Sequence, residues 1–469
     1  MEGSMSLEEQ LKEINDMGIT ICNKTYKFKS FSPNKFAEYV SKNSNLIYSK
    51  GDFYNYKNGK WTKVEELTVL QKIRNLLHKY YKDIWSTKRE KEYIEALKRI
   101  IHYDGEFNNN KRYINMLNGM YDLEKFILVE HNKNFYSTIQ IPINYLPNAE
   151  CPMFIKFLKD SFQDDEESEK LAQEWAGYLL TAETKAQKAL LLYGSGANGK
   201  GVFIDLISEC IGEENISNIP LNELHRGFSR ICLLNKLANI SSENETNGKS
   251  INTQYFKMIT GEDIINAEQK NKPVISFRNT AKIVLSTNNL PHTRDNSYGY
   301  WRRISVLNFC NTVKEEDRDR DLKDKLKTEL QGIFLWAIDG LKRLKENNYK
   351  FTESKNSEQV LSQYQREINP FILFFEECIQ KVDKSYREDN RVIYKSFKMW
   401  AKANGMEGLA QISVQKFWRK FEEEAKRLGI EECVSKKSGN VRYHTCVKVV
   451  GDFRFDEVNN PVYRGTLGG

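Results

Sequence analysis

The spacing of apolar and polar residues predicts several kinds of segment along the chain. Residues 61–101 carry apolar side chains at three- and four-residue intervals, which is typical of amphipathic helices. From residue 112 to about 152 the apolar runs are short and are interrupted by proline and by Asn118-Gly119, which indicates strands joined by tight turns. The acidic stretch 164–169 then opens a helical pattern that continues to Leu180, because carboxylates stabilise a helix N-terminus.

The middle of the chain has the pattern of a parallel α/β sheet. Residues 189–193, 236–241 and 282–286 are continuous apolar runs, as expected of strands that are buried on both faces. Helical stretches separate these runs, so we expect an α/β sheet between about residues 150 and 310. Residues 321–346 return to the pattern of one amphipathic helix.

The last part of the chain, from about residue 386, reads as two helices followed by a hairpin around Ser438-Gly439-Asn440. Together these patterns predict four regions. They are an N-terminal α+β domain of unassigned role at 1–150, an α/β core at 151–345, a helical connector at 346–385, and a helix–helix–hairpin domain at 386–469.

Composition narrows the class of protein. The 469 residues are 40% hydrophobic and 29% charged, which excludes a largely disordered chain, a collagen-like chain and a disulfide scaffold. The eight cysteines are scattered without a Cys-x-x-Cys, and the six histidines do not cluster with them, so we expect reduced thiols and no zinc site. We find no apolar run near the 18 or so residues of a membrane span and no apolar signal segment, and we therefore predict a cytosolic protein without a membrane partner.

The most specific motif is a glycine-rich turn between a predicted strand and a predicted helix. A phosphate-binding loop requires this context, because backbone N–H groups and the helix N-terminus then point at the phosphates. The alternative is an ordinary turn. The cradle residues, with the lysine expected on the β- and γ-phosphates and the two residues after it, are Gly194, Ser195, Gly196, Ala197, Asn198, Gly199, Lys200, Gly201 and Val202.

Position 201 departs from the usual motif. The residue after the lysine is normally a Ser or Thr whose hydroxyl binds Mg²⁺, and here it is Gly201. We therefore expect the metal that accompanies ATP to be held through water or by other groups.

Polar residues follow the next two predicted strands. Glu243 and Glu245 come after the second strand, where a carboxylate can hold metal and polarise water beside a nucleotide. Two loop glutamates are otherwise ordinary surface residues. Asn288 follows the third strand and can orient the attacking water, although Asn-Asn-Leu-Pro is also common turn chemistry. Arg302 and Arg303 can neutralise a transferring phosphoryl group, or they are a solvated pair.

The order of these motifs resembles superfamily 3 helicases of the AAA+ class, in the phage and plasmid primase-helicase branch. That branch includes replication initiators of phage satellites such as staphylococcal pathogenicity islands. The resemblance covers about residues 110–370. Besides the motifs above, it is carried by the segments 118–119, 148–152, 171–180, 187–188 and 255–263.

The resemblance implies a P-loop AAA+ core and a role for each motif. Lys200 is then the phosphate-loop lysine, Glu243 the carboxylate that binds Mg²⁺ and polarises water, and Glu245 a second acid. Asn288 is the sensor, and Arg302 or Arg303 is the finger that completes a neighbour's site. The family forms rings, usually hexamers, around single-stranded DNA, moves 3′→5′ along it, and would place this chain in the cytoplasm of a bacterial host.

The segment 264–277 predicts a hairpin with a polar tip. In superfamily 3 rings, a hairpin here projects into the channel and grips phosphates. Without the surrounding motifs it would be an exposed hairpin with solubilising lysines. The tip residues that would contact single-stranded DNA are Lys270, Asn271 and Lys272.

The C-terminal helices and hairpin suggest a winged-helix domain that binds double-stranded origin DNA. The net charge of +7 supports this, because residues 391–450 alone hold 13 Lys and Arg against 6 Asp and Glu. A winged helix that docks a protein is the alternative. The expected duplex contacts are Lys416, Arg419, Lys420, Lys436, Lys437 and Arg442.

These features predict an ATP-dependent replicative DNA helicase and origin-binding initiator of a mobile genetic element. One alternative is an ATPase that melts or marks an origin without processive unwinding. Another is a sequence-specific regulator whose ATP site controls assembly. A primase activity is not expected, because the Asp-x-Asp run at 317–321 lies in a charge-dense, solvated segment.

Overall fold

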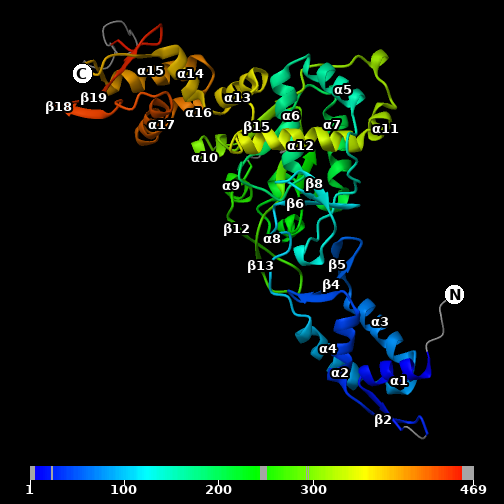
Figure 1. Cartoon of the computed structure of the whole chain (residues 1–469). Coiled ribbons are helices and arrows are strands. Elements are labelled where there is room, and N and C mark those ends of the chain that lie inside the picture. Colours follow the sequence, from blue (N-terminus) through cyan, green and yellow to red (C-terminus); the bar gives the residue numbers. More distant parts are fainter. Residues whose placement is uncertain (1–5, 23–24, 243–250, 292, 294, 457–469) are drawn as a thin grey trace. The chain divides into compact units, whose positions relative to one another are not determined.

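The computed structural model describes residues 6–22, 25–242, 251–291, 293 and 295–456, and Figure 1 shows the elements along the chain. Two compact units are present, and the chain passes between them several times. The larger unit consists of the described residues of Met1–Glu245, Asn252–Asn289 and Arg302–Lys355. The smaller unit consists of those of Thr246–Ile251, Leu290–Trp301 and Asn356–Gly469.

The first hundred residues form a small α+β arrangement around its own apolar core, which includes Phe36, Phe53 and Leu97. Residues 60–64 form a strand because they pair with the preceding strand, so the predicted helical stretch begins only at residue 66. The elements are α1 (Leu7–Asp16), β1 (Ile19–Ile21), β2 (Phe28–Phe31), α2 (Pro33–Asn43), β3 (Leu46–Ser49), β4 (Asp52–Lys57), β5 (Lys60–Val64), α3 (Glu66–His78) and α4 (Thr87–Ile100).

The predicted strands after residue 112 form an antiparallel three-stranded sheet of β6 (Tyr113–Met116), β7 (Gly119–Asp122) and β8 (Ile127–Val129). Met116 pairs with Gly119, so the turn is Leu117-Asn118, one residue earlier than the sequence suggested. The guanidinium of Arg112 lies 2.5 Å from the Asp122 carboxylate and lowers its pKa to about 2.

A parallel five-stranded sheet forms the centre of the larger unit, which confirms the predicted α/β sheet. Residues 189–192 in this sheet are apolar and almost fully buried, as expected of a parallel strand that is covered on both faces. In spatial order the strands are β10 (Ile216–Ser217), β11 (Ala238–Ser242), β14 (Lys282–Thr287), β9 (Ala189–Tyr193) and β15 (Ile304–Asn308).

Helices α6 (Glu166–Leu179) and α12 (Leu330–Glu346) pack closely together beside this sheet (Figure 1). Their backbones approach at Gly177 and Gly340, where a Cβ atom would collide with a carbonyl oxygen of the opposite helix. The remaining helices around the sheet include α5 (Pro152–Phe162), α7 (Lys200–Ile211), α9 (Thr253–Thr260) and α11 (Leu322–Lys327).

The single helix predicted at 321–346 is wrong, because the chain forms two helices that break at Glu329. The Glu329 carboxylate accepts hydrogen bonds from the N–H groups of Met153 (3.1 Å) and Phe154 (2.9 Å) at the start of α5. A carboxylate at a helix N-terminus is stabilised by the helix dipole. The break therefore follows from a contact with a helix almost 180 residues earlier in the chain.

The smaller unit has a second core, in which Phe371 and Phe375 pack with Phe397, Trp400 and Phe421. The predicted helix–helix–hairpin order is confirmed, with the hairpin turn at Gly439. The elements are α13 (Lys355–Ile368), α14 (Pro370–Cys378), β16 (Ile379–Lys381), β17 (Arg387–Asp389), α15 (Asn390–Ala403), α16 (Glu407–Ala410), α17 (Val414–Arg427), β18 (Ser435–Ser438), β19 (Val441–Thr445) and β20 (Val447–Val449).

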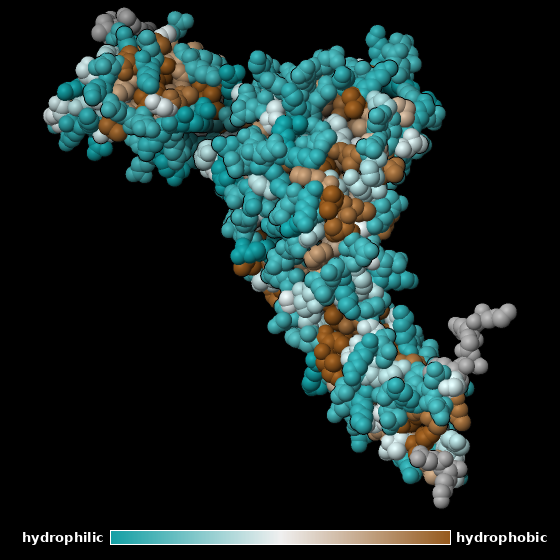
Figure 2. All heavy atoms as spheres, viewed as in Figure 1, coloured by the Kyte–Doolittle hydropathy of each residue, from teal (hydrophilic) through white to brown (hydrophobic). Residues whose placement is uncertain are grey.

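The face of the molecule in Figure 2 is mostly hydrophilic, with hydrophobic side chains in separate patches. In the part of the chain that the structure describes, none of the helices has the length and apolar character needed to cross a membrane.

A buried lysine gives the larger unit a specific pH dependence. Lys282, at the start of β14, donates to the carbonyl groups of Thr181 and Thr280, and burial lowers its pKa from 10.5 to about 7. Glu183 and Lys111 are the nearby charges that act on it, in opposite directions. Between these two pKa values the unfolded chain binds a proton that the folded chain does not, so stability rises with pH.

We therefore expect Lys282→Met to remove this slope. From pH 7.5 to 9 the unfolding free energy of the wild type should rise by about 2 kcal/mol relative to the variant, since one proton corresponds to about 1.4 kcal/mol per pH unit. Urea titrations of both proteins at the two pH values measure the difference. Identical pH slopes would contradict a neutral, buried Lys282.

Candidate active site

The glycine loop, residues 194–199, joins the end of β9 to the start of α7. Gly194, Gly196 and Gly199 have φ values of 154°, 98° and 90°, which side-chain-bearing residues rarely adopt. A Cβ on Gly199 would lie 2.9 Å from both Phe157 and Ser161 of α5. The loop is thus held against α5 with its backbone turned toward the N-terminus of α7, where the unsatisfied N–H groups of a helix favour an anion.

Lys200 begins α7 and is only 6% exposed. Its ammonium donates to the Gly194 carbonyl (2.6 Å), the Asn198 side-chain oxygen (3.3 Å) and the Asn288 side-chain oxygen (2.9 Å). These three acceptors are neutral. An anionic oxygen that replaced one of these neutral oxygens would form a stronger, charge-assisted bond with the ammonium.

The contact between Lys200 and Asn288 lies between β9 and β14, two neighbouring strands whose following connections run in opposite directions across the sheet. After β9 the chain crosses toward β10 at one edge of the sheet, whereas after β14 it crosses to β15 at the other edge. In open parallel sheets, ligands bind outside the carboxyl ends of the strands at such a point. The topology therefore places two of the sequence-predicted residues at the position where a ligand is expected.

The predicted carboxylates cannot be placed. Strand β11, which precedes them, is the neighbour of β14 and ends at Ser242 opposite Ser286. Glu243 and Glu245 themselves lie outside the described residues. Their role with Mg²⁺ stays a prediction.

Gly201 is exposed on the first turn of α7, and no atom lies within 4 Å of where its Cβ would be. Nearby hydroxyl groups are those of Ser195 and Thr312, which lie 3.1 Å apart beside the glycine loop. The space at position 201 would accept the hydroxyl residue of the usual motif. Its absence is therefore not forced by packing.

The arginine pair lies at the amino ends of the parallel strands, whereas the glycine loop lies at their carboxyl ends. Arg302 and Arg303 directly precede β15, and the Arg303 carbonyl accepts a hydrogen bond from the N–H of Ala189 at the start of β9 (2.7 Å). Arg302 is exposed and donates to the Gln187 side chain at 3.0 Å. A five-residue strand spans about 16 Å, so neither guanidinium shares the edge of the glycine loop in its own chain.

The predicted hairpin is confirmed as an antiparallel pair of β12 (Ile264–Ala267) and β13 (Ile275–Arg278). Its tip residues, Lys270, Asn271 and Lys272, are exposed. Lys272 lies 3.2 Å from the Asp52 carboxylate, which also binds Lys63 at 2.7 Å. The tip therefore offers lysine ammonium groups in an exposed position, one of them already paired with an acid.

Phe228 is 60% exposed on the short helix α8 (Gly227–Arg230) and was not among the residues predicted from the sequence. This helix is fixed to the hairpin, since Gly227 accepts from the N–H of Glu268 (3.1 Å) and Arg230 donates to the Asn266 carbonyl (2.8 Å). The sequence does contain one signal for this residue, which is a phenylalanine in a polar stretch between two predicted strands.

In the smaller unit, most of the predicted duplex contacts are exposed. Lys416 and Arg419 lie on the outer face of α17, and Lys420 is half-buried with its ammonium 5.7 Å from the Phe371 ring. The remaining three, on the β18–β19 hairpin, are fully exposed: Lys436, Lys437 and Arg442.

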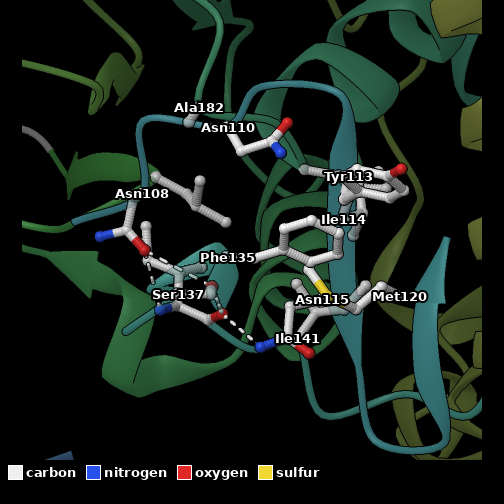
Figure 3. A pocket seen from close by; sticks show the side chains of 13 residues that line it. Asn108, Asn110, Tyr113, Ile114, Asn115, Met120, Phe135, Ser137, Ile141 and Ala182 are labelled. Carbon is white, nitrogen blue, oxygen red and sulfur yellow. Dashed lines mark hydrogen bonds between the residues drawn. The ribbon is translucent and has the colours of Figure 1, made fainter. Parts of the chain in front are cut away.

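A cavity of about 30 Å³ lies beside the β6–β8 sheet, away from these residues (Figure 3). Asn108 and Ser137 contribute polar atoms, and the Asn108 side chain is bonded to the N–H groups of Thr138 and Ile139. A cavity of this volume has room for about two water molecules. This cavity is therefore too small for a nucleotide or a base.

Two family models match parts of the chain. Residues 34–163 match a family described as "D5 N terminal like", and residues 192–303 match "Family of unknown function (DUF5906)". The second range contains the glycine loop, the hairpin and the arginine pair. Each model covers less than half of the chain.

Curated relatives are viral and phage proteins. The chain is 22% identical over 346 residues to "Putative helicase L207/L206" of Acanthamoeba polyphaga mimivirus, covering 65% of this chain and 35% of that protein. It is 24% identical over 389 residues to "Putative helicase 184R" of Invertebrate iridescent virus 6, covering 71% and 39%. It is 25% identical over 177 residues to "DNA Primase-polymerase" of Nitratiruptor phage NrS-1, covering 36% and 24%. The chain thus spans between about a quarter and two fifths of these relatives.

Two solved structures that are similar to this chain carry the same name, NrS-1, as the last of these relatives. The chain is similar to the apo NrS-1 C-terminal region, with a TM-score of 0.52 at 13% identity in one crystal form, covering 90% of this chain and all of that one. A second apo structure gives 0.52 at 15% identity with the same coverage. The fold is shared. The chain is therefore related to viral and phage helicase and primase proteins.

The glycine loop allows a matched test of its geometry. Gly199→Ala should lower the unfolding free energy by about 1–3 kcal/mol, because a side chain at φ 90° is strained and its Cβ meets Phe157 and Ser161. Gly201→Ala should raise it by up to about 1 kcal/mol, because the position is helical and open. Urea unfolding measures both. Equal effects of the two substitutions would contradict the loop conformation.

Proposed function

We propose that the chain is the motor of an ATP-dependent replicative DNA helicase that also binds an origin, encoded by a mobile genetic element. The observation that carries the proposal is the contact between Lys200 and Asn288 at the carboxyl edge of the parallel sheet. The Lys200 ammonium beside the glycine loop fits the phosphates of a nucleotide. The Asn288 side chain at the end of β14 fits the water that attacks them.

In this proposal ATP binds with its phosphates on the N–H groups of residues 194–199 and on Lys200. Mg²⁺ would be held by Glu243 and water rather than by a hydroxyl at 201, with Glu245 as a second acid. The metal would neutralise charge on the transferring phosphoryl group. Asn288 would orient the water, and ATP hydrolysis would supply the energy for movement.

The arginine pair supports a multi-subunit arrangement. Because Arg302 and Arg303 precede β15 at the opposite sheet edge, they are better placed to complete a site in a neighbouring subunit than the site of their own chain. An arginine supplied from a neighbour is a recurrent device for phosphoryl transfer. We therefore propose a ring, by resemblance a hexamer, that hydrolyses ATP between subunits.

The DNA contacts follow from exposed basic and aromatic groups. Single-stranded DNA would pass along the hairpin tips, with Lys270, Asn271 and Lys272 on its phosphates and Phe228 against its bases. Double-stranded origin DNA would bind the smaller unit as a winged helix, through α17 and the β18–β19 hairpin. The names of the curated relatives support a replicative role.

One observation favours a second candidate function. The open space at Gly201 means that a hydroxyl could be present and is not, so the chain lacks a common Mg²⁺ ligand. A weak ATPase that controls assembly or origin melting, without processive unwinding, would tolerate this.

We expect Lys200→Ala to abolish ATP hydrolysis and strand displacement together. Removing the ammonium takes away the main cation of the proposed phosphate site, a loss of 10²-fold or more by order of magnitude. Lys323→Ala is the matched control, since that lysine pairs with Asp205 on the surface of the same unit. Forked substrates with 3′ and 5′ tails test the direction. ATP-independent displacement by Lys200→Ala would eliminate the motor and leave the second candidate.

We also expect the β18–β19 hairpin to contribute to duplex binding through phosphates. Replacing Lys436, Lys437 and Arg442 with alanine should reduce the slope of log affinity against log salt by about three, roughly one for each phosphate contact. Lys402→Ala, on α15, serves as a control outside the proposed surface. Fluorescence anisotropy with an origin duplex at several salt concentrations gives the slopes. An unchanged slope in the triple variant would point to the protein-docking alternative.

A further inference from the structure

The described residues of Leu290–Trp301 connect the two candidate catalytic elements while belonging to the smaller unit. The chain leaves the larger unit directly after Asn288-Asn289 and returns to it at Arg302-Arg303. The position of this segment therefore bears on both the amide that contacts Lys200 and the arginine pair.

Tyr364 of α13 holds both ends of this segment. Its hydroxyl donates to the Pro291 carbonyl near the first end and lies 3.1 Å from the Tyr300 hydroxyl near the second. The ring of Trp301 packs edge-on against the Tyr364 ring, with centroids 5.1 Å apart. One side chain thus contacts residues three positions after Asn288 and one position before Arg302.

Both tyrosine side chains in this contact are buried. Tyr300 and Tyr364 are 1% and 2% exposed, and α10 (Tyr298–Trp301) begins after Ser297, whose carbonyl accepts from the N–H of Tyr300 at 3.0 Å. A buried hydroxyl that loses its partner is costly, so this pair has one favoured arrangement. A change in the position of α13 would therefore move both ends of the segment together.

The C-terminal end of α13, about one turn after Tyr364, is tied to the proposed DNA-binding helix. Asn369, between α13 and α14, donates from its side chain to the Glu424 carboxylate of α17 at 2.9 Å. Glu424 is 3% exposed and is also paired with Arg427 at 2.5 Å. The link from α17 to Tyr364 therefore consists of the hydrogen bond between Asn369 and Glu424 and the last turn of α13.

We propose that Tyr364 is a positioning residue through which the smaller unit controls ATP hydrolysis. It holds both ends of the segment that follows the sensor amide and precedes the arginine pair, so duplex DNA on α17 alters turnover by displacing α13. This inference rests on the proposed ATPase. It assigns a role to side chains that touch neither nucleotide nor DNA, and because the effect is on turnover it requires no equal change in duplex affinity.

The test compares Tyr364→Phe with Tyr394→Phe. Tyr394 offers a matched control because its hydroxyl also donates to a backbone carbonyl in the smaller unit, that of Ile412 at 2.7 Å, away from residues 290–301. We expect Tyr364→Phe to lower kcat for ATP by roughly tenfold and to leave KM within about twofold, since catalytic groups are misplaced while binding groups stay. Tyr394→Phe should leave both unchanged, and stimulation by duplex DNA should be lost only in Tyr364→Phe.

A purely structural role for Tyr364 would give equal losses of thermal stability in the two variants and wild-type kcat in both, which overturns the inference. Hydrogen exchange of α13 adds a readout that needs no turnover. A non-hydrolysable ATP analogue should change exchange in α13 of the wild type and not of Tyr364→Phe. If the analogue binds and α13 is unaffected, the inference fails even if the proposed ATPase stands. If Lys200→Ala and the wild type bind no nucleotide, both fail.

Discussion

The buried contact between the Lys200 ammonium and the Asn288 side chain is the interaction on which the rest of the candidate site depends. It joins the first residue of α7 to the first residue after β14, and it exists because β9 and β14 are adjacent parallel strands. Lys200 is only 6% exposed, and its ammonium would be costly to bury without acceptors. The glycine loop supplies two of these acceptors, and the neighbouring strand supplies the third.

The surrounding packing holds this arrangement in place. Gly199 is fixed against Phe157 and Ser161 of α5, and the start of α5 is capped by Glu329 at the break between α11 and α12. Helix α12 in turn packs on α6, where glycines allow close backbone contact. The position of the loop thus depends on α5, on Glu329, and on the packing of α12 against α6. A glycine motif without these contacts says little about function.

Much of the fold could be predicted from the sequence because it depends on local patterns. The apolar runs at 189–193 and 282–286 identify central strands, and the polar tip at 270–272 identifies a hairpin. Features that depend on distant contacts could not be predicted. The break at Glu329 requires knowledge of α5, and the exposure of Phe228 requires knowledge of how α8 packs on β12. The separation of Arg302 from the glycine loop follows from the parallel direction of β9 and β15, because the loop follows one strand and Arg302 precedes the other.

Asn288 could be chosen from the sequence because it follows a recognisable strand, whereas Tyr364 carries no signal beyond an aromatic residue in an amphipathic helix. The central claim is that the junction of β9 and β14 is a nucleotide phosphate site. A structure of the wild-type chain with Mg²⁺ and a non-hydrolysable ATP analogue tests it most directly. We expect phosphate oxygens on the N–H groups of residues 194–199, with the Lys200 ammonium turned from Asn288 or Gly194 to the terminal phosphates. A nucleotide bound elsewhere, with Lys200 still held by Asn288 and Gly194 and the loop empty, would contradict it.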